Sequence, residues 1–413
     1  MVEVRYLRGD RAGQSRGART DDNRVMDLCG VLAHLNCNTG HAGPHCPDRS
    51  GIIGSPPRKA KLAPTRQVWV TRSGPPDALQ LRATELPPPG PDQARVAVSY
   101  AGVNFADIAA RVGVYHGAPR PPFVPGFELS GTIAELGEPT ATGTSDWPRP
   151  GAAVVALSRY GGYADHVNLP LQQLLPLPAD FSLQTAAAMP IAFLTAYQAL
   201  VVMGSVRTGS RVLIIGAGGG LGLAAVEICH VMEATVLAAS SAHKHQHLID
   251  RGVRHVIDYI TADVATAVDT ITHGEGVDVV LEPRGAASWP TSYAMLAATG
   301  RLIICGNAAA VPDLRPRPLA TLVANLRFAV ASFSGLRLVR DNRAVMGVHL
   351  GQMWGASARV RQWLQILLEW VEGGRLKPHV DRVFALERAA AAHTYIQNRS
   401  NTGKVLLRAG EPE

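Results

Sequence analysis

Cysteine, aromatic residues and long apolar runs are scarce in this sequence. Only 5 of its 413 residues are cysteine, aromatic residues make up 6% and charged residues 18%. The sequence contains no Cys-x-x-Cys pair, no apolar run of about 18 residues suited to crossing a membrane, and no apolar signal-peptide core after the first Met. So few cysteines suit a reduced intracellular compartment. We therefore expect a cytoplasmic protein with no stable membrane insertion.

The chain also has little net charge once the first 65 residues are left out. The chain has a net charge of +7, but residues 1–65 hold ten Lys or Arg against six Asp or Glu, a net +4, which leaves +3 for the rest. The body of the chain is close to neutral and lacks a basic stripe interleaved with aromatic residues. Nucleic acid is therefore not expected as a partner.

Residues 1–65 show little hydrophobic periodicity and are rich in Arg, Gly, Ser, Asn and Pro. This composition predicts a disordered tail, or an over-extended start of the reading frame. A zinc cluster is the alternative for six Cys and His residues, but their spacing matches no familiar ligand pattern. They are Cys29, His34, Cys37, His41, His45 and Cys46.

The strongest signal lies in residues 211–222, where a short apolar strand runs into a glycine-dense turn and then into a helix over 223–232. Glycines at 216, 219 and 222 allow a tight turn, close approach of the backbone to a ligand, and close packing of helix on strand. The helix start offers unpaired N–H groups and a partial positive charge, which suit a pyrophosphate. The alternative is a tight strand–helix turn without a ligand.

Further strands and helices alternate after this turn. The expected strands are 235–239, 255–259, 277–281 and 301–306, with 342–347 as a possible sixth strand of the sheet. The expected helices are 243–251, 262–272, 288–298 and 319–331. This alternation predicts an α/β fold with a doubly wound parallel sheet that binds a dinucleotide at the carboxyl ends of its strands.

The end of the second strand indicates which dinucleotide binds. NAD-binding proteins usually carry an acid there for the ribose 2′-OH, but this sequence has Ser240, Ser241 and Lys244 and no acid. Two hydroxyls and an ammonium suit a 2′-phosphate, so we expect NADPH. Ser240 could also cap the following helix.

Residues 66–188 are expected to form a second, β-rich domain, because short alternating strands are separated there by Pro and Gly turns. A helix over 185–203 links it to the nucleotide-binding domain, which we place at 189–350. Residues 351–408 return to mixed structure, and strand 404–407 is expected to rejoin the first domain.

A β-rich domain split around an inserted nucleotide-binding domain resembles the medium-chain dehydrogenase/reductase superfamily. Residues 104–115 match the signature N-x-x-D-x-x-x-R-x-G-x-Y of its zinc-free quinone-oxidoreductase branch at every fixed position. Five stretches are similar to the vesicle amine transport protein family within that branch: 124–128, 241–245, 342–351, 377–381 and 403–407. The resemblance implies a Rossmann sheet inserted in a GroES-like domain.

The resemblance also implies chemistry without zinc. In the zinc alcohol dehydrogenases a Cys ligand falls where Asn104 stands and a His ligand where Phe127 stands, and neither residue replaces such a ligand. A conjugated acceptor can delocalise the charge that zinc would otherwise stabilise. The implied reaction is therefore hydride transfer from NADPH to a quinone or enone.

Three residues are the catalytic candidates that the resemblance implies, each with a plainer alternative. Asn104 would orient the substrate carbonyl or the nicotinamide ribose, or is a turn residue. Tyr115 would donate to the developing oxyanion, or only forms a wall of the cleft. Thr195 matches a family residue near the nicotinamide, or serves packing. Behind them, Glu128 is expected as a buried acid, and Asp107 and Arg111, four residues apart, are expected to pair.

The cofactor-binding candidates lie at the ends of the strands. Tyr259 resembles a family position that closes over the adenosine phosphate, and Arg284 would reach a cofactor phosphate or face solvent. The full set is Gly216, Gly218, Gly219, Gly220, Leu221, Gly222, Ser240, Ser241, Lys244, Tyr259, Arg284 and Gly306.

Two further expectations concern association. Strand 301–306 is placed toward one edge of the sheet, where pairing with the same strand of a second copy would cover it, unless residues 311–331 fold back over the edge. The family also implies a dimer. A reductase-like scaffold acting in membrane or vesicle association is the alternative function, although no lipid anchor or basic amphipathic helix is evident.

Overall fold

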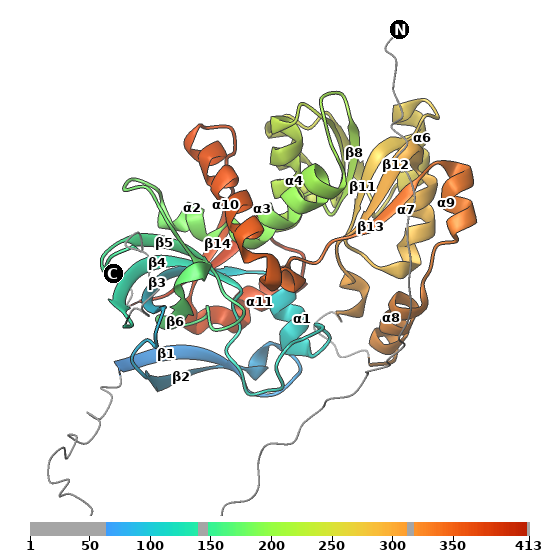
Figure 1. Cartoon of the computed structure of the whole chain (residues 1–413). Coiled ribbons are helices and arrows are strands. Elements are labelled where there is room, and N and C mark those ends of the chain that lie inside the picture. Colours follow the sequence, from blue (N-terminus) through green and yellow to red (C-terminus); the bar gives the residue numbers. More distant parts are fainter. Residues whose placement is uncertain (1–62, 139–147, 312–317, 411–413) are drawn as a thin grey trace, which may run out of the picture. The chain divides into compact units, whose positions relative to one another are not determined.

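The expected parallel sheet is present and has six strands. The computed structural model describes residues 63–138, 148–311 and 318–410. The strands are β8 (Arg211–Ile215), β9 (Thr235–Ser240), β10 (His255–Asp258), β11 (Val277–Glu282), β12 (Leu296–Ile304) and β13 (Ala344–Gly347). Their order is β10-β9-β8-β11-β12-β13, all parallel, which confirms the doubly wound fold (Figure 1).

Helices cover both faces of this sheet because its strands are apolar on both sides. Val212 and Ile214 pack toward α4 (Gly220–Val231), whereas Leu213 and Ile215 belong to a second core with α6 (Val264–Thr272) and α7 (Trp289–Ala294). The remaining helices of this lobe are α5 (His245–Asp250), α8 (Pro318–Val330) and α9 (Gly335–Asp341).

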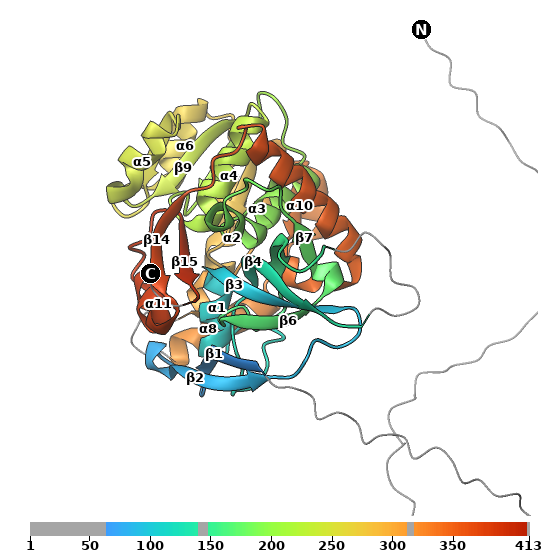
Figure 2. The ribbon, with the colours of Figure 1, turned by 90° about the vertical axis from the view of Figure 1, so that its left-hand side faces the viewer.

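The other lobe is built on antiparallel strands. β1 (Ala63–Val70) pairs with β2 (Leu79–Leu86). A larger sheet contains β3 (Gln93–Val103), β4 (Glu128–Leu136), β5 (Ala153–Leu157), β6 (His166–Pro170), β7 (Leu174–Pro176), β14 (Val380–Ala385) and β15 (Lys404–Arg408). β15 pairs with β3, so the last strand rejoins the first domain as predicted (Figure 2).

Five α-helices are described in this lobe and in its link to the parallel sheet. They are α1 (Phe105–Val112), α2 (Leu183–Ala187), α3 (Pro190–Tyr197), α10 (Ser357–Glu372) and α11 (Ala389–Gln397). The single helix expected over 185–203 is broken, because Pro190 cannot continue α2 and instead occupies the first turn of α3. A π-helical segment, Gln198–Met203, follows α3.

Two expectations about the fifth strand are wrong. The helix expected over 288–298 ends at Ala294, because Leu296 pairs with Val277 in the sheet and is only 2% exposed. β12 is also not an edge strand: it lies between β11 and β13, and Ile303 is fully buried. The edge strand on this side of the sheet is β13, so pairing with a second copy cannot use residues 301–306.

The expected tail largely falls outside the described residues. Its Cys and His cluster lies there, as do all of residues 1–62, while residues 63–65 already belong to β1. Within the described ranges no single helix is long and apolar enough to cross a membrane. The pair α8–α9, bent by 73°, passes that test of length and composition only when both helices are counted together.

Candidate functional site

A cavity of about 830 Å³ lies between the parallel sheet and the antiparallel lobe. One wall is formed at the carboxyl ends of the parallel strands, by Ile215, Pro283, Cys305 and Val348. The antiparallel lobe contributes the opposite wall, which includes Asn104. The position matches the rule that open α/β sheets bind ligands at the carboxyl ends of their strands.

The glycine turn between β8 and α4 opens into this cavity. Gly216 has a φ of 76°, in the left-handed region that favours glycine. A Cβ on Gly222 would lie 2.3 Å from the carbonyl oxygen of Gly216, so only glycine allows the first turn of α4 to pack so closely. Five residues of the turn line the cavity, namely Gly216, Gly219, Gly220, Leu221 and Gly222.

Gly218 faces another direction. Its carbonyl accepts a hydrogen bond from the backbone N–H of Gly403 at 3.0 Å, which ties the turn to the segment before β15. A Cβ on Gly218 would meet the Lys244 side chain at 2.5 Å. The glycine here therefore makes room for Lys244, and Gly218 is not among the residues that line the cavity.

The three candidates after β9 divide into two groups. Lys244 lines the cavity, whereas Ser240 and Ser241 are buried and do not. The Ser241 side chain makes no capping hydrogen bond, and the Ser240 hydroxyl donates to the Ser241 carbonyl at 3.4 Å instead of capping a helix. Lys244 Nζ donates to the Asn401 carbonyl, and burial lowers the pKa of this lysine.

Three further candidates also line the cavity: Tyr259, Arg284 and Gly306. Arg284 also has an acid partner that the sequence analysis did not assign to it. Its guanidinium pairs with Glu282 at 2.7 Å and donates to the Ser292 hydroxyl at 3.2 Å. Its side chain is 41% exposed while Glu282 is fully buried, so Arg284 compensates the buried charge of that acid.

Asn104 is held by two buried charged residues of the antiparallel lobe. Its Nδ2 donates to Glu128 Oε1 at 2.7 Å, and its Oδ1 accepts from Lys404 Nζ at 2.6 Å. Lys404 also forms an ion pair with Glu128, whose Oε2 accepts from the backbone N–H of Ile191 at 2.7 Å. Asn104 and Lys404 line the cavity, and Glu128 lies behind them.

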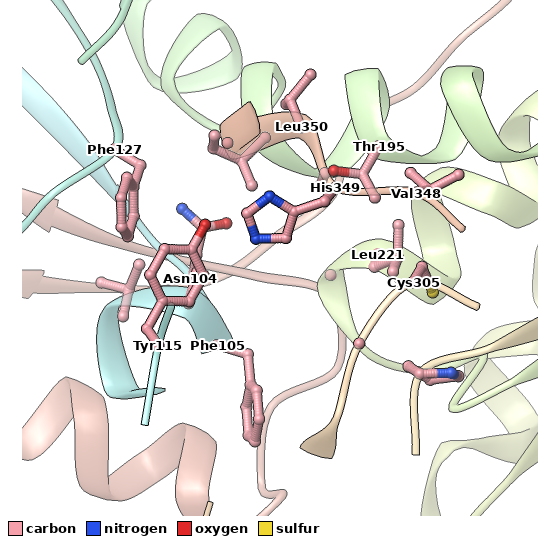
Figure 3. A pocket seen from close by; sticks show the side chains of 18 of the residues that line it. Asn104, Phe105, Tyr115, Phe127, Thr195, Leu221, Cys305, Val348, His349 and Leu350 are labelled. Atoms are coloured by element: carbon pink, nitrogen blue, oxygen red, sulfur yellow. The ribbon is translucent and has the colours of Figure 1, made fainter. Parts of the chain in front are cut away.

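Tyr115, Thr195 and His349 line the part of the cavity that also contains Asn104 (Figure 3). The centre of the Tyr115 ring is 5.5 Å from that of Phe127 and 5.6 Å from that of His349, and the Tyr115 and His349 ring planes are inclined by 30°. Burial raises the pKa of Tyr115 to about 12, and burial together with His116 lowers the pKa of His349. At neutral pH the site therefore presents a protonated phenol beside a neutral imidazole.

Asp107 and Arg111 do not pair with each other, contrary to expectation. Asp107 accepts from the backbone N–H groups of Asn104 and Gly126, both at 2.9 Å, and closes a capping box at the start of α1. Arg111 donates to Gln397 Oε1 at 2.6 Å. Both side chains are completely buried. Asp107 therefore fixes α1 to the segment before β4, and Arg111 fixes it to α11.

Sequence reasoning missed Lys404, His349 and Asn401. These residues were missed because they lie far along the chain from the residues they contact. Lys404 contacts Asn104, and Asn401 contacts Lys244, both more than a hundred residues away. The one available signal was the Gly403–Lys404 dipeptide, which starts the last strand where it rejoins β3. Only the tertiary fold shows that this strand starts beside the glycine turn.

The residues present do not fit a catalytic zinc. Asn104 and Phe127 occupy the two ligand positions, and the Lys404 ammonium is hydrogen-bonded to Asn104, where it would repel a divalent cation. In the described ranges no group of three or more His, Cys, Asp or Glu could hold a metal ion.

Comparison with known proteins places this geometry in a family. Residues 90–179 match the alcohol dehydrogenase GroES-like domain, and residues 251–407 match the zinc-binding dehydrogenase family. The human synaptic vesicle membrane protein VAT-1 homolog is 36% identical over 335 residues, 80% of this chain and 83% of that protein. The bovine quinone oxidoreductase-like protein 2 is 31% identical over 323 residues, 78% of this chain and 86% of that protein.

Solved structures agree with the sequence matches. The crystal structure of the human VAT-1 homolog-like protein has a TM-score of 0.71 at 28% identity and covers 85% of this chain and 99% of its own. A mycobacterial protein solved in complex with NADPH has a TM-score of 0.71 at 26% identity, covering 83% and 99%. The chain therefore belongs to the medium-chain dehydrogenase/reductase superfamily of oxidoreductases, in the group of the synaptic vesicle membrane protein VAT-1 homologues.

Proposed function

We propose that this oxidoreductase uses NADPH to reduce quinones or other conjugated carbonyl compounds and needs no zinc. The observation that carries the proposal is the site around Asn104. The ammonium of Lys404 stands beside Asn104 in the region where a zinc enzyme would hold its metal, and the same cavity contains the glycine turn. The relative named as a quinone oxidoreductase-like protein supports the choice of substrate class.

The cavity has the features that a dinucleotide requires. The first turn of α4 presents unpaired N–H groups to it, and the absence of side chains at Gly216 and Gly219 lets a pyrophosphate approach the backbone. Lys244 lies where the ribose 2′-phosphate is expected, after β9, and no acid lines the cavity there. The mycobacterial structure that contains NADPH supports the same choice of cofactor.

In this proposal the chain's own residues orient and polarise the substrate. A bound nicotinamide supplies the hydride. Tyr115 donates its hydroxyl proton in a hydrogen bond to the substrate carbonyl oxygen as charge develops there, and His349 lines the same pocket. Lys404 and Glu128 hold the Asn104 amide in one orientation. The final proton comes from water or a hydroxyl group.

NADPH oxidation measured against paired substrates tests the proposal. Cyclohexenone and naphthoquinone should be reduced, whereas cyclohexanone should not, because it cannot delocalise the charge without a Lewis acid. NADH in place of NADPH serves as the cofactor control. Equal rates with cyclohexenone and cyclohexanone, or no rate with any conjugated acceptor, would contradict it.

Metal analysis tests zinc independence separately. Purified protein should contain no stoichiometric zinc, and a chelator should leave its NADPH oxidation rate unchanged, since Asn104 and Phe127 provide no ligand. A zinc ion that is lost together with activity on chelation would overturn this part of the proposal.

We further propose that two copies associate through β13 and the α8–α9 surface. Within the described residues β13 pairs only with β12, which leaves its other edge without a strand partner. Eight of the 13 exposed large hydrophobic side chains in the described ranges belong to α8 and α9. An unpaired edge and an apolar surface both require cover, and a second copy supplies both across a two-fold axis.

A further inference from the structure

The cavity is lined by cations and by no acid. Among the described residues that form its walls there is no Asp or Glu, but six are Lys or Arg. They are Arg159, Lys244, Arg284, Arg361, Arg399 and Lys404. A low-dielectric cavity with charges of one sign concentrates ligands of the opposite sign. The phosphates of a dinucleotide account for only some of these cations.

Four of the six already have a role near the glycine turn or an acid partner. Lys404 pairs with Glu128 and Arg284 pairs with Glu282. Lys244 packs on Gly218, and Arg399 belongs to the segment that leads to Gly403 and is tied to the turn. The two that remain, Arg159 and Arg361, come from the antiparallel lobe and from α10.

Arg361 is a half-buried guanidinium with no acid beside it. Its NH1 donates to the carbonyl of Leu174 in β7, and no ion pair or second hydrogen bond holds it within the described residues. Burial lowers its pKa, and no neighbouring carboxylate raises it. Leaving a desolvated charge without an anion costs free energy, and a bidentate carboxylate or phosphate would relieve that cost.

A continuous wall joins Arg361 to the part of the cavity that contains Tyr115 and His349. Residues 348–354 line the cavity, followed by Ser357, Val360 and Arg361 on successive turns of α10. Trp354 stands in this wall with the Arg159 guanidinium 5.9 Å from its ring centre. The wall therefore runs from His349, beside Tyr115, along an apolar surface to two arginines.

We propose that the substrate of this reductase carries an anionic group, a carboxylate or a phosphate, which binds Arg361 and Arg159 while its conjugated carbonyl lies at Tyr115 and His349. This inference rests on the proposed reductase function. It narrows the substrate class from conjugated carbonyls in general to conjugated carbonyls with an anionic tail held along residues 348–361.

Paired substrates separate charge from shape. One pair is an enone with a terminal carboxylate and its methyl ester; the other is the octenoyl thioester of 4′-phosphopantetheine and that of pantetheine, which differ only in the phosphate. The wild type should have the higher kcat/KM for the charged member of at least one pair, and the pair that responds tells carboxylate from phosphate. Equal values within both pairs would overturn the inference.

Variants of two arginines on α10 test whether Arg361 causes the preference for the charged substrate. Arg361→Gln should reduce the preference for the charged member roughly 10- to 100-fold, the effect expected for lost hydrogen bonds to a charged group. Arg361→Lys should retain part of it, because the charge remains and the bidentate geometry is lost. Arg359→Gln is the control, since Arg359 is exposed on the same helix and does not line the cavity. An equal loss in both Gln variants would refute the assignment.

A binding measurement distinguishes failure of this inference from failure of the reductase proposal. Binding of octanoate is followed by the change in Trp354 fluorescence. The same titration of Trp354→Phe gives the signal of the other tryptophans, which is subtracted. Methyl octanoate serves as the neutral probe. Octanoate should bind more tightly than its ester, and Arg361→Gln should remove the difference. If that holds while no conjugated acceptor is reduced, only the reductase proposal fails. If acceptors are reduced but octanoate has no advantage, only the anion site fails.

Discussion

At the scale of one residue, the proposal that this chain uses NADPH rests on Lys244. Its ammonium is buried beside the glycine turn and is held by the Asn401 carbonyl, so it is fixed before a cofactor arrives. We expect Lys244→Ala to weaken NADPH binding roughly 10- to 100-fold, because a hydrogen bond to a charged group contributes ~1.5–3 kcal/mol. NADH binding should change far less. Cofactor titrations of this variant and of the exposed control Arg254→Ala measure the difference. Equal weakening of both cofactors would exclude this role for Lys244.

Asp107 gives a pH-dependent prediction. Burial raises its pKa to about 7, although the N–H groups of Asn104 and Gly126 and the charge of Lys404 act in the opposite direction. An unfolded Asp titrates near pH ~4, so between there and about pH 7 the folded state keeps a proton that the unfolded state has lost. The free energy of unfolding should therefore fall as pH rises through this window.

Asp107→Asn tests that dependence. The wild type should lose more unfolding free energy than Asp107→Asn between about pH 5 and about pH 8, because Asn has no proton to release. Urea unfolding at the two pH values, with Asp180→Asn as an exposed control, measures this. A parallel decline in wild type and Asp107→Asn would show that Asp107 is already ionised when folded.

Some residues of the site could be predicted from their neighbours in the sequence, and others could be identified only from long-range contacts. Gly216 and Gly222 follow from the geometry of a strand–turn–helix unit, which the neighbouring residues specify by themselves. The roles of Lys404 and Arg361 do not follow from neighbouring residues, because their partners Asn104 and Leu174 are brought to them only by the fold. Arg284 was assigned no acid partner, although Glu282 lies two residues away, because a buried acid at the end of a strand leaves no mark in the pattern.

At the scale of elements, apolar periodicity identified the strands better than the helix ends. β8 runs over Arg211–Ile215, as the pattern predicts, because four apolar residues stand between Arg211 and the glycine-rich turn. Residues 296–298 are also apolar and were assigned to a helix, but the ladder with β11 places them in β12. Tertiary pairing decides such ambiguous segments, and intrinsic propensity does not.

The contact between β8 and α4 gives the prediction at this scale. A Cβ on Gly222 would lie 2.3 Å from the Gly216 carbonyl oxygen and 2.5 Å from that of Ala217, and both are backbone atoms that cannot yield cheaply. We expect Gly222→Ala to destabilise the protein by ~1–3 kcal/mol, the usual cost of overpacking, and to weaken NADPH binding. Gly335→Ala, where no atom lies within 4 Å, is the control. Unchanged urea unfolding and cofactor binding in Gly222→Ala would contradict this packing.

At the scale of the whole molecule, the sequence predicted the two lobes but assigned the edge of the sheet to the wrong strand. β13 was recognised only as a possible sixth strand, and its presence moves the exposed edge away from Ile303. A proline at Ile303 would therefore disrupt the interior of the sheet and would say nothing about association. The apolar surface of α8 and α9 also escaped notice, because apolar residues in a helical pattern are expected to be buried.

Association of two copies is the prediction that belongs to this scale. Sedimentation should give twice the 43.8 kDa chain mass, because pairing across β13 would bury Leu326 and Leu336, which are 60% and 80% exposed in one copy. Leu326→Asp combined with Leu336→Asp should shift the protein to one chain mass, since two desolvated carboxylates would face the partner. Ile260→Asp, at a side chain 69% exposed beyond β10, should leave the mass unchanged. A wild type at one chain mass would refute the dimer.

If that monomer also floats with lipid vesicles and the double variant does not, the α8–α9 surface serves membrane association instead.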